Sequence, residues 1–332
     1  MKSMQQTSRR LALILLPLLA IAPAGAQGPA DDAANFPARA IRIVVPFPAG
    51  GPADIMARLI GQRMSEDWGQ PVVTENRPGT NTVIGAQAVA KAAPDGYTLL
   101  MAIDSTLVMN QYLYRTPPYD PLADFAPITL TSKSISLLSV SAATGPKTVK
   151  QLIANARASP GKLNYGGGTI TSQLMGVLFN KAAGVDIVYV PFKGTPETVQ
   201  GLLTGSVDLI YAASPIVMPL AESGQIRPLA KMDSRQHPSL PDLPTVSEAA
   251  GFGFDDIAVW LGLVAPRATP QAVIDKLQRK VVQILHDPAV KEKSERSGNF
   301  VVTTTPAEFS AFIATEAARW SKVLKETNIR YD

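Results

Sequence analysis

The stretch Ile41-Arg-Ile-Val-Val-Pro-Phe-Pro-Ala-Gly-Gly-Pro-Ala-Asp-Ile-Met-Ala-Arg58 reads as a buried strand, a glycine turn and the start of a helix. Its β-branched residues suit a strand covered on both faces, and apolar residues at helical spacing follow the turn. Gly50 and Gly51 permit close backbone approach, and Pro52 suits a first helical turn, where its missing N–H costs no hydrogen bond. Unpaired amides at such a helix start favour a carboxylate or phosphate. The same residues also allow a purely structural turn in which Asp54 caps its own helix.

The same alternation of strand, turn and helix recurs along the chain. Expected strands at 72–75 and 98–102 extend the first series, and a second series runs from about residue 134 to 212. Such alternation predicts an α/β fold with two lobes, each a mostly parallel sheet flanked by helices. Two long helices, expected at 270–285 and 306–326, have no strand series of their own, so we expect them to pack on the first lobe.

Proline-rich segments at 117–127 and 238–244 precede the two places where the chain would cross between the lobes. We therefore assign residues 36–134 and 259–332 to lobe 1 and residues 135–258 to lobe 2. Two crossings of this kind predict a hinge.

Residues 1–26 have the pattern of an export signal. Three basic residues precede an apolar run from 11 to 21, and Ala24-Gly25-Ala26 supplies a small-residue cleavage pattern. The apolar run is too short to span a bilayer, and no later run approaches about 18 apolar residues, so we expect an exported protein without a membrane anchor. General secretion is favoured over twin-arginine export.

Composition argues against several classes of protein. Once the three basic residues of the signal are removed from the 31 in the chain, 28 basic residues face 27 acidic ones. No basic patch is interleaved with aromatic residues, which argues against nucleic-acid binding. The chain has no cysteine and therefore no disulfide, and its only histidines are His237 and His286. We expect neither a metal site of the ordinary His/Cys type nor a metal cofactor.

Enzyme motifs are weak or missing. The chain lacks the Gly-x-x-x-x-Gly-Lys-Ser/Thr of phosphate-binding loops and the Gly-x-Ser-x-Gly of many hydrolases. Gly166-Gly167-Gly168 does not fit the dinucleotide-binding pattern, because Thr171 stands at the place of its last glycine. We therefore expect no catalytic residues and no nucleotide cofactor.

Several separated motifs resemble one known family. They are Ile43–Asp54, Gly69–Gly79, Ala88–Leu99, Pro160–Tyr165, Val190–Gly194, Gly205–Asp208, Asp242–Glu248 and Ala318–Trp320. In this order they cover nearly all of the mature chain, and together they resemble the solute-binding receptors of tripartite tricarboxylate transporters, also called the Bordetella uptake gene family. Agreement of several separated motifs is more specific than a single glycine turn.

This resemblance implies a two-lobed periplasmic binding protein fold, type II-like, in a protein of the periplasm. Such a receptor closes around a small di- or tricarboxylate or an aromatic acid and presents it to membrane permease subunits. We expect a monomer without a nucleic-acid partner. By the family pattern, the ligand carboxylate lies between loop 47–51 of lobe 1 and loop 166–172 of lobe 2, and loop 104–107 also lines the cleft.

These loops and the neighbouring turn of lobe 2 supply the expected ligand-binding residues. They are Phe47, Ala49, Gly50, Gly51, Ser105, Thr106, Gly168, Thr169, Thr171, Ser172, Phe192, Lys193 and Gly194. Hydroxyls and free amides can hold a carboxylate without a permanent ion pair, but Thr171 or Ser172 could instead only cap the helix. Lys193 could meet a second carboxylate or remain a solvated surface lysine.

The chain departs from the family pattern at three places. It has Phe192 where the family often has Tyr, Gln173 where it often has His, and Asn81-Thr82 where it often has a glycine pair. These differences bear on the identity of the ligand and not on the fold.

Two alternative functions stay open at this point. One is an exported hydrolase with Ser105 or Ser172 as nucleophile and a remote His237 as base. The other is a receptor without its own permease, which serves as the ligand-loaded partner of a sensor.

Overall fold

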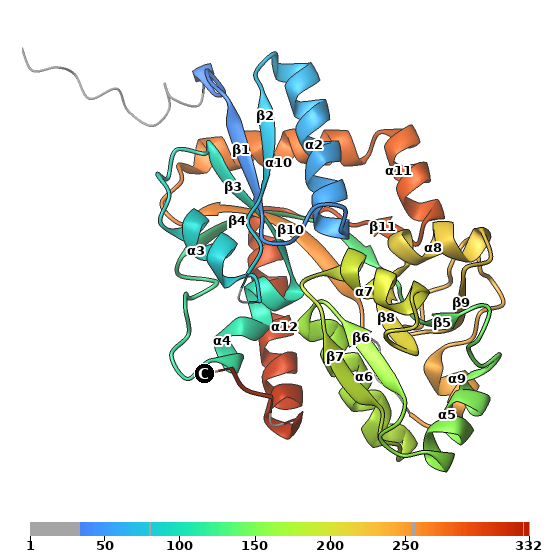
Figure 1. Ribbon diagram of the computed structural model, residues 1–332. Helices are drawn as coiled ribbons and strands as arrows, with labels where there is room; N and C mark the ends of the chain where they lie inside the picture. Colours follow the sequence, from blue (N-terminus) through green and yellow to red (C-terminus); the bar gives the residue numbers. More distant parts are fainter. Residues whose placement is uncertain (1–33, 80, 254–256, 328, 332) are drawn as a thin grey trace, which may run out of the picture.

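The computed structural model describes residues 34–331 except 80, 254–256 and 328. The expected export signal, 1–26, therefore lies outside the described residues. The described chain forms two lobes, each built around one β-sheet with helices on its faces (Figure 1). None of the described helices combines the length and the apolar character needed to cross a membrane.

The strand order of the first sheet is β11-β4-β10-β3-β1-β2, and that of the second is β7-β6-β8-β5-β9. The strands of the first sheet are β1 Ile41–Val45, β2 Val72–Asn76, β3 Thr98–Ile103, β4 Phe125–Ser134, β10 Val259–Pro266 and β11 Asn299–Val301. Those of the second are β5 Ser136–Ser141, β6 Asn164–Gly167, β7 Val188–Pro191, β8 Leu209–Ala213 and β9 Ile226–Lys231.

The described helices lie between these strands and after them. Their bounds are α2 Pro52–Trp68, α3 Val83–Ala90, the short π-helix η1 Ser105–Met109, α4 Asn110–Leu113, α5 Val149–Ala158, α6 Ile170–Ala183, α7 Thr195–Leu203, α8 Ser214–Glu222, α9 Val246–Ala250, α10 Gln271–Leu285, α11 Pro288–Arg296 and α12 Pro306–Thr327.

Both sheets are mixed, which corrects the expectation of mostly parallel sheets. In the first, β1 is parallel to β2 and β3, whereas β10 is antiparallel to β3 and β4. In the second, β6 is parallel to β7 and β8, whereas β5 is antiparallel to β8 and β9. Parallel neighbours need a crossover connection. Strand β4 instead runs into β5 through Ile135 alone, and β10 comes back from the other lobe, so no such crossover sets their direction.

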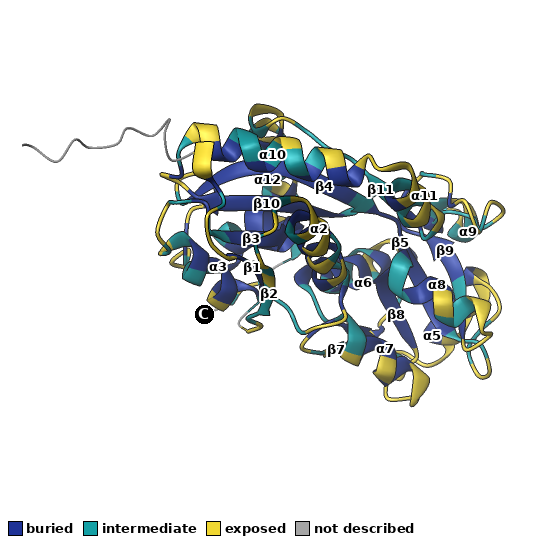
Figure 2. Cartoon of the chain, turned by 90° about the horizontal axis from the view of Figure 1, so that it is seen from above, coloured by how far each residue is buried: buried dark blue, intermediate teal, exposed yellow. Residues whose placement is uncertain are grey.

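Helices cover both faces of the first sheet. Helices α2 and α10 pack on one face, and α3, η1 and α12 pack on the other. Strands β1, β3, β4 and β10 between them are buried along most of their length (Figure 2). On the α12 side, the Trp260 ring lies edge-on to Phe309 and Phe312, with centroid distances of 5.9 and 5.2 Å. The two long C-terminal helices thus pack on the first sheet, as expected.

Strand β4 was not expected from the sequence, because its residues Phe-Ala-Pro-Ile-Thr-Leu-Thr-Ser-Lys-Ser mix polar and apolar side chains. The strand is nevertheless almost wholly buried. Its two threonine hydroxyls have backbone acceptors: Thr129 donates to Thr304 O at 2.9 Å, and Thr131 donates to Leu261 O at 3.0 Å. Hydroxyls satisfied in this way allow a polar strand to sit in a core.

A buried histidine joins the two lobes beside the connecting segments. His237 is fully buried, and its Nε2 contacts the hydroxyl of Ser214, the first residue of α8. That hydroxyl donates to Ser297 O at 2.6 Å, and Ser239 N donates to His237 Nδ1 at 3.1 Å. Nε2 must therefore be the protonated nitrogen of a neutral ring. Burial, and then the charge of Lys231, lowers the pKa of His237 below its ordinary value.

We predict that His237 destabilises the protein as the pH becomes mildly acidic. Because folding lowers its pKa from 6.5, its contribution to stability is complete above that pH and is lost as the pH falls below it. His237→Gln should therefore remove up to about 1.4 kcal/mol per pH unit from the pH dependence of the free energy of unfolding, measured by urea melts. His286→Gln, at an exposed position, is the control. Equal pH slopes in wild type and His237→Gln would contradict this.

Candidate functional site

A small cavity of about 50 Å³, the inner cavity, lies between the two lobes. The first lobe contributes the turn after β1, the start of α2, the end of β3 and the start of β10. The second lobe contributes the starts of α6 and α7 and the end of β8. None of these described lining residues has a charged side chain.

Helix N-termini from both lobes converge on the inner cavity. Pro52 and Ala53 of α2 line it, as do Thr171 of α6 and Thr195 of α7. The N-cap residues of α2 and α7 are glycines without a side-chain capping bond. Helix N-termini carry partial positive charge and amide donors. Such helix starts favour an anion, and no described residue with a charged side chain lines the cavity.

A larger cavity of about 670 Å³, the outer cavity, shares Phe47, Gly168 and Thr169 with the inner one. Aromatic rings line much of it, namely Phe47, Tyr114, Tyr189, Phe192 and Tyr331. Among its described lining residues, Lys193 alone is charged. Phe47, Phe192 and Lys193 were expected from the sequence. The three tyrosines were not, because they come from three distant segments of the chain.

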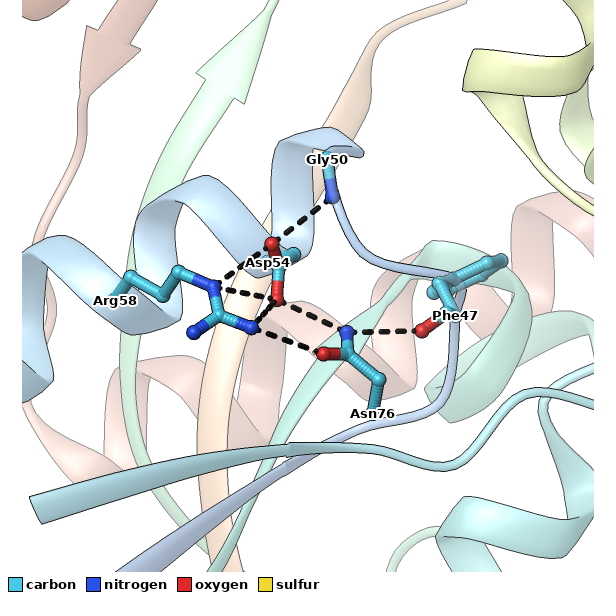
Figure 3. A network of polar contacts seen from close by, with 5 residues as sticks. All are labelled: Phe47, Gly50, Asp54, Arg58 and Asn76. Carbon is cyan, nitrogen blue, oxygen red and sulfur yellow. Dashed lines mark hydrogen bonds and ion pairs between the residues drawn. The ribbon is translucent and has the colours of Figure 1, made fainter.

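The turn after β1 takes the predicted form, with Gly51 as N-cap and Pro52 as the first residue of α2. The Gly50 amide, however, donates to Asp54 Oδ2 at 2.9 Å, as the structural reading of the turn allowed (Figure 3). Asp54 also accepts from Arg58 Nε and from Asn76 Nδ2, which donates at 2.9 Å. The Gly50 amide is thus already engaged. Ala49 and Gly50 are exposed and line neither cavity.

The charge of Asp54 is balanced inside the first lobe. Burial raises its pKa, but hydrogen bonds from Arg58, Gly50 and Asn76 outweigh this, so the pKa of Asp54 lies below its ordinary value. Arg58 and Asp54 also form an ion pair of 3.0 Å. Asp54 is therefore a carboxylate that holds the turn in shape, with its charge paired on the α2 side.

Helix α6 begins earlier than expected, and Thr169 is its N-cap. The Thr169 hydroxyl accepts from Ser172 N at 3.1 Å, and Ser172 Oγ accepts from Thr169 N at 3.2 Å. This capping box starts the helix at Ile170. The alternative in which Thr171 or Ser172 is the N-cap is therefore wrong, because the Thr169 hydroxyl accepts the hydrogen bond from the free amide of Ser172.

Thr171 connects the two lobes through a buried hydrogen bond. Its side chain is fully buried and lines the inner cavity, and its hydroxyl donates to Asp104 Oδ1 at 2.9 Å. Asp104 follows β3 and caps η1, with Ser105 N donating to the same oxygen at 2.7 Å. Burial raises the pKa of Asp104 to about 7. Loop 104–107 was expected to line the cleft, but Asp104 was not among the expected ligand-binding residues, although an acidic residue directly after the apolar run 99–103 was a usable signal.

The rest of the third loop stays away from both cavities. Ser105 and Thr106 are fully buried and line neither one. Thr106 donates to Thr82 Oγ1 at 3.1 Å, and Ser105 Oγ has no hydrogen-bond partner among the described residues. The structure thus brings Asp104, and not Ser105 or Thr106, toward the second lobe.

Asn81 and Thr82 have the left-handed backbone that a glycine pair adopts without strain, with φ of 47° and 76°. Asn110 holds both residues: Asn81 Nδ2 donates to Asn110 Oδ1 at 2.6 Å, and Asn110 Nδ2 donates to Thr82 Oγ1 at 3.1 Å. These side-chain hydrogen bonds stabilise a backbone conformation that glycine would adopt without strain. Both residues line the outer cavity.

Two glycines shape the narrow end of the cleft. Gly168 and Gly194 line the inner cavity, and a side chain on Gly168 would collide with the Gly194 backbone. Pro48 of the first lobe lies against Gly194 in turn. The close approach of these loops is possible only without side chains.

The hydrolase alternative lacks its base. His237 contacts Ser214, and not Ser105 or Ser172. The Ser172 hydroxyl donates to Thr169 O at 2.7 Å within the capping box. The described residues also contain no group of three or more His, Asp or Glu side chains that could hold a metal ion.

Comparisons with known proteins agree with this geometry. Residues 56–329 match the family described as tripartite tricarboxylate transporter family receptor. The structure of Rhodopseudomonas palustris Rpa4515 with adipate is similar, with 36% identity, a TM-score of 0.85, and coverage of 89% of this chain and 99% of that one.

Two further structures are similar at lower identity. MatC of R. palustris with bound malate has 31% identity and a TM-score of 0.80, over 87% of this chain and 100% of its own. The periplasmic binding protein BugD has 30% identity and a TM-score of 0.84, over 90% of this chain and 100% of its own. Since the family match spans most of the chain, this protein belongs to the tripartite tricarboxylate transporter receptor family, as its motifs indicated.

Proposed function

We propose that this protein is a periplasmic receptor that captures a small carboxylate between its lobes and delivers it to a tripartite tricarboxylate-type permease. One observation carries the proposal: helix N-termini of both lobes meet at a cavity without a charged side chain. Such a site suits an anion that must be released again, because each charge-assisted hydrogen bond contributes only about 1.5 to 3 kcal/mol. The similar proteins BugD, Rpa4515 and MatC support the location and the ligand class.

The outer cavity would hold the remainder of the ligand. Its aromatic rings suit an apolar or aromatic body, and Lys193 can receive a second carboxylate. A dicarboxylate, a tricarboxylate and an aromatic acid all fit this arrangement. In this proposal the ligand contacts come from Phe47, Gly51, Gly168, Thr169, Thr171, Ser172, Phe192, Lys193 and Gly194, all of which line one of the two cavities.

Ligand capture requires the lobes to open and close. We propose that residues 36–134 and 259–332 move as lobe 1 against lobe 2, residues 135–258. The hinge would be Ile135 and the return segment at Ile257, just before β10. The two lie close together, because Ile257 N donates to Met232 O at 2.9 Å and Met232 N donates to Ser136 O at 2.9 Å. A few residues that absorb the change in backbone angles suffice for such a motion.

We predict that a small carboxylate stabilises the protein against heat. At a ligand concentration about 100 times its dissociation constant, the stabilisation should be about 2.7 kcal/mol, or roughly 5 to 10 °C in Tm. Malate, adipate, citrate and an aromatic dicarboxylate should be screened beside their uncharged amides, with and without a chelator. The amides should give no shift, and the chelator should change nothing. A panel in which no acid raises Tm would sink the proposal.

We predict that bound carboxylate makes the particle more compact, because the two sides of the site lie on different lobes. Small-angle scattering at saturating adipate should give a smaller radius of gyration than in its absence. Adipamide serves as the uncharged control. If calorimetry shows saturation while the scattering profile stays the same, closure does not accompany binding.

We predict that two neighbouring threonines have separable roles. Thr171→Val removes a hydroxyl from the inner cavity and should weaken the binding of the carboxylate about tenfold or more. Thr169→Ala removes the helix cap and should cost about 0.5 to 2 kcal/mol of stability with a smaller change in affinity. Calorimetric titration and urea melts on both variants decide this. Normal affinity in Thr171→Val would remove Thr171 from the ligand site.

A further inference from the structure

Asp104 is a buried carboxyl group on the boundary between the lobes, and no cation pairs with it among the described residues. Its side chain is fully buried. Oδ1 accepts from Ser105 N on its own lobe and from Thr171 Oγ1 of the other lobe, whereas Oδ2 has no partner among the described residues. A buried ionised oxygen without a partner is costly, and a neutral carboxyl avoids most of that cost.

The groups packed around Asp104 favour its neutral form. The pKa of Asp104 is raised to about 7. Burial is the main cause, and the negative charge of Glu316 on α12 contributes to the rise. Glu316 lies 3.7 Å from Arg319 of its own helix. Its negative charge also raises the pKa of Lys133 on β4, which burial lowers. The hydrogen bonds from Ser105 and Thr171 act in the other direction but do not outweigh burial.

Only one of the two carboxyl oxygens of Asp104 has an acceptor within reach for a bound proton. On Oδ2 it would have no acceptor among the described residues, whereas on Oδ1 it points to Thr171 Oγ1 at 2.9 Å. The direction of this hydrogen bond then reverses, and the Thr171 hydroxyl proton becomes free. Its other neighbour is the Met109 sulfur at 3.9 Å, a weak acceptor. Since Thr171 lines the inner cavity, the freed proton is available to a ligand there.

We propose that Asp104 is a positioning residue of this receptor: when it is protonated, it donates to Thr171 and makes the Thr171 hydroxyl a donor to the ligand carboxylate. This inference rests on the proposed carboxylate site. Near and above neutral pH, binding takes up one proton from the solvent, which is held on Asp104 Oδ1. With Asp104 ionised, the Thr171 hydroxyl donates its proton to Asp104 Oδ1 and not to the ligand, and the buried negative charge repels the ligand.

The first test needs no ligand. Infrared difference spectra between about pH 6 and 9 should contain the carbonyl band of a protonated carboxyl that disappears as the pH rises through about 7. The band should be missing in Asp104→Asn, and in Glu316→Gln it should disappear at a lower pH. Absence of the band from the wild type refutes the proposal, whichever ligand the protein binds.

The second test is calorimetric titration with adipate between about pH 6.5 and 8.5, where adipate is fully ionised, in buffers of different ionisation enthalpy. The wild type should take up close to one proton per adipate at the upper end, and its affinity should weaken by up to about tenfold per pH unit. Asp104→Asn, whose amide can donate to Thr171 at every pH, should bind with a constant affinity and without proton uptake. Thr171→Val should bind weakly throughout.

The outcomes separate the two proposals. Wild-type pH dependence that persists in Asp104→Asn, or adipate binding by the wild type without proton uptake, overturns the role of Asp104. If Asp104→Asn does not fold, Glu316→Gln decides: its proton uptake must shift to a lower pH, and an unchanged midpoint counts against the proposal. If the wild type shows the infrared band but binds neither adipate nor malate, the proposed carboxylate ligand fails instead.

Discussion

Helices from two separate sheets direct their N-termini at one small cavity, and the rest of the structure is arranged around that requirement. The starts of α2, α6 and α7 line the same space although they belong to different lobes. Backbone loops can approach this closely only where side chains are absent, as at Gly168 and Gly194. Helix dipoles favour an anion at such a place, so an anion can bind without forming a salt bridge that would slow its release.

Two buried carboxyl groups lie next to these helix starts, and their surroundings give them opposite charge states. Asp54 is paired with Arg58 and Asn76 and has a lowered pKa. Asp104 has only neutral hydrogen-bond partners, with Glu316 as the charged group that acts on it, and its pKa is raised. The difference comes from the presence or absence of a cation. Asp54 therefore stabilises its own turn, whereas Asp104 is free to change its charge.

Apolar and polar side chains both contact across the cleft: one buried apolar cluster includes Leu107 and Met109 of lobe 1 and Leu174 of lobe 2. Besides the Thr171 bond to Asp104, the Tyr331 hydroxyl donates to Gln173 Oε1 at 3.1 Å. Lys181 and Glu326 form an ion pair of 3.0 Å, but both side chains are about two-thirds exposed, so the pair adds little stability. The lobes are connected more firmly at the junction around His237, beside the segments that join them. In the closure proposed above, the cleft contacts would change while the junction around His237 stays in place.

The sequence alone was sufficient for the α/β class, the family and the glycine turn before Pro52, because these depend on local periodicity and on residues with special backbone preferences. It could not decide the strand directions of β4, β5 and β10, which follow from pairing between distant segments. Nor could it decide which side-chain oxygen accepts a hydrogen bond from a given backbone amide. Thr169, and not Thr171 or Ser172, is the N-cap of α6, and Asp54 accepts the hydrogen bond from the Gly50 amide. Only tertiary packing decided the burial of Asp104, its bond to Thr171 and the place of Tyr331 in the outer cavity, because burial and partners arise only when distant parts of the chain meet.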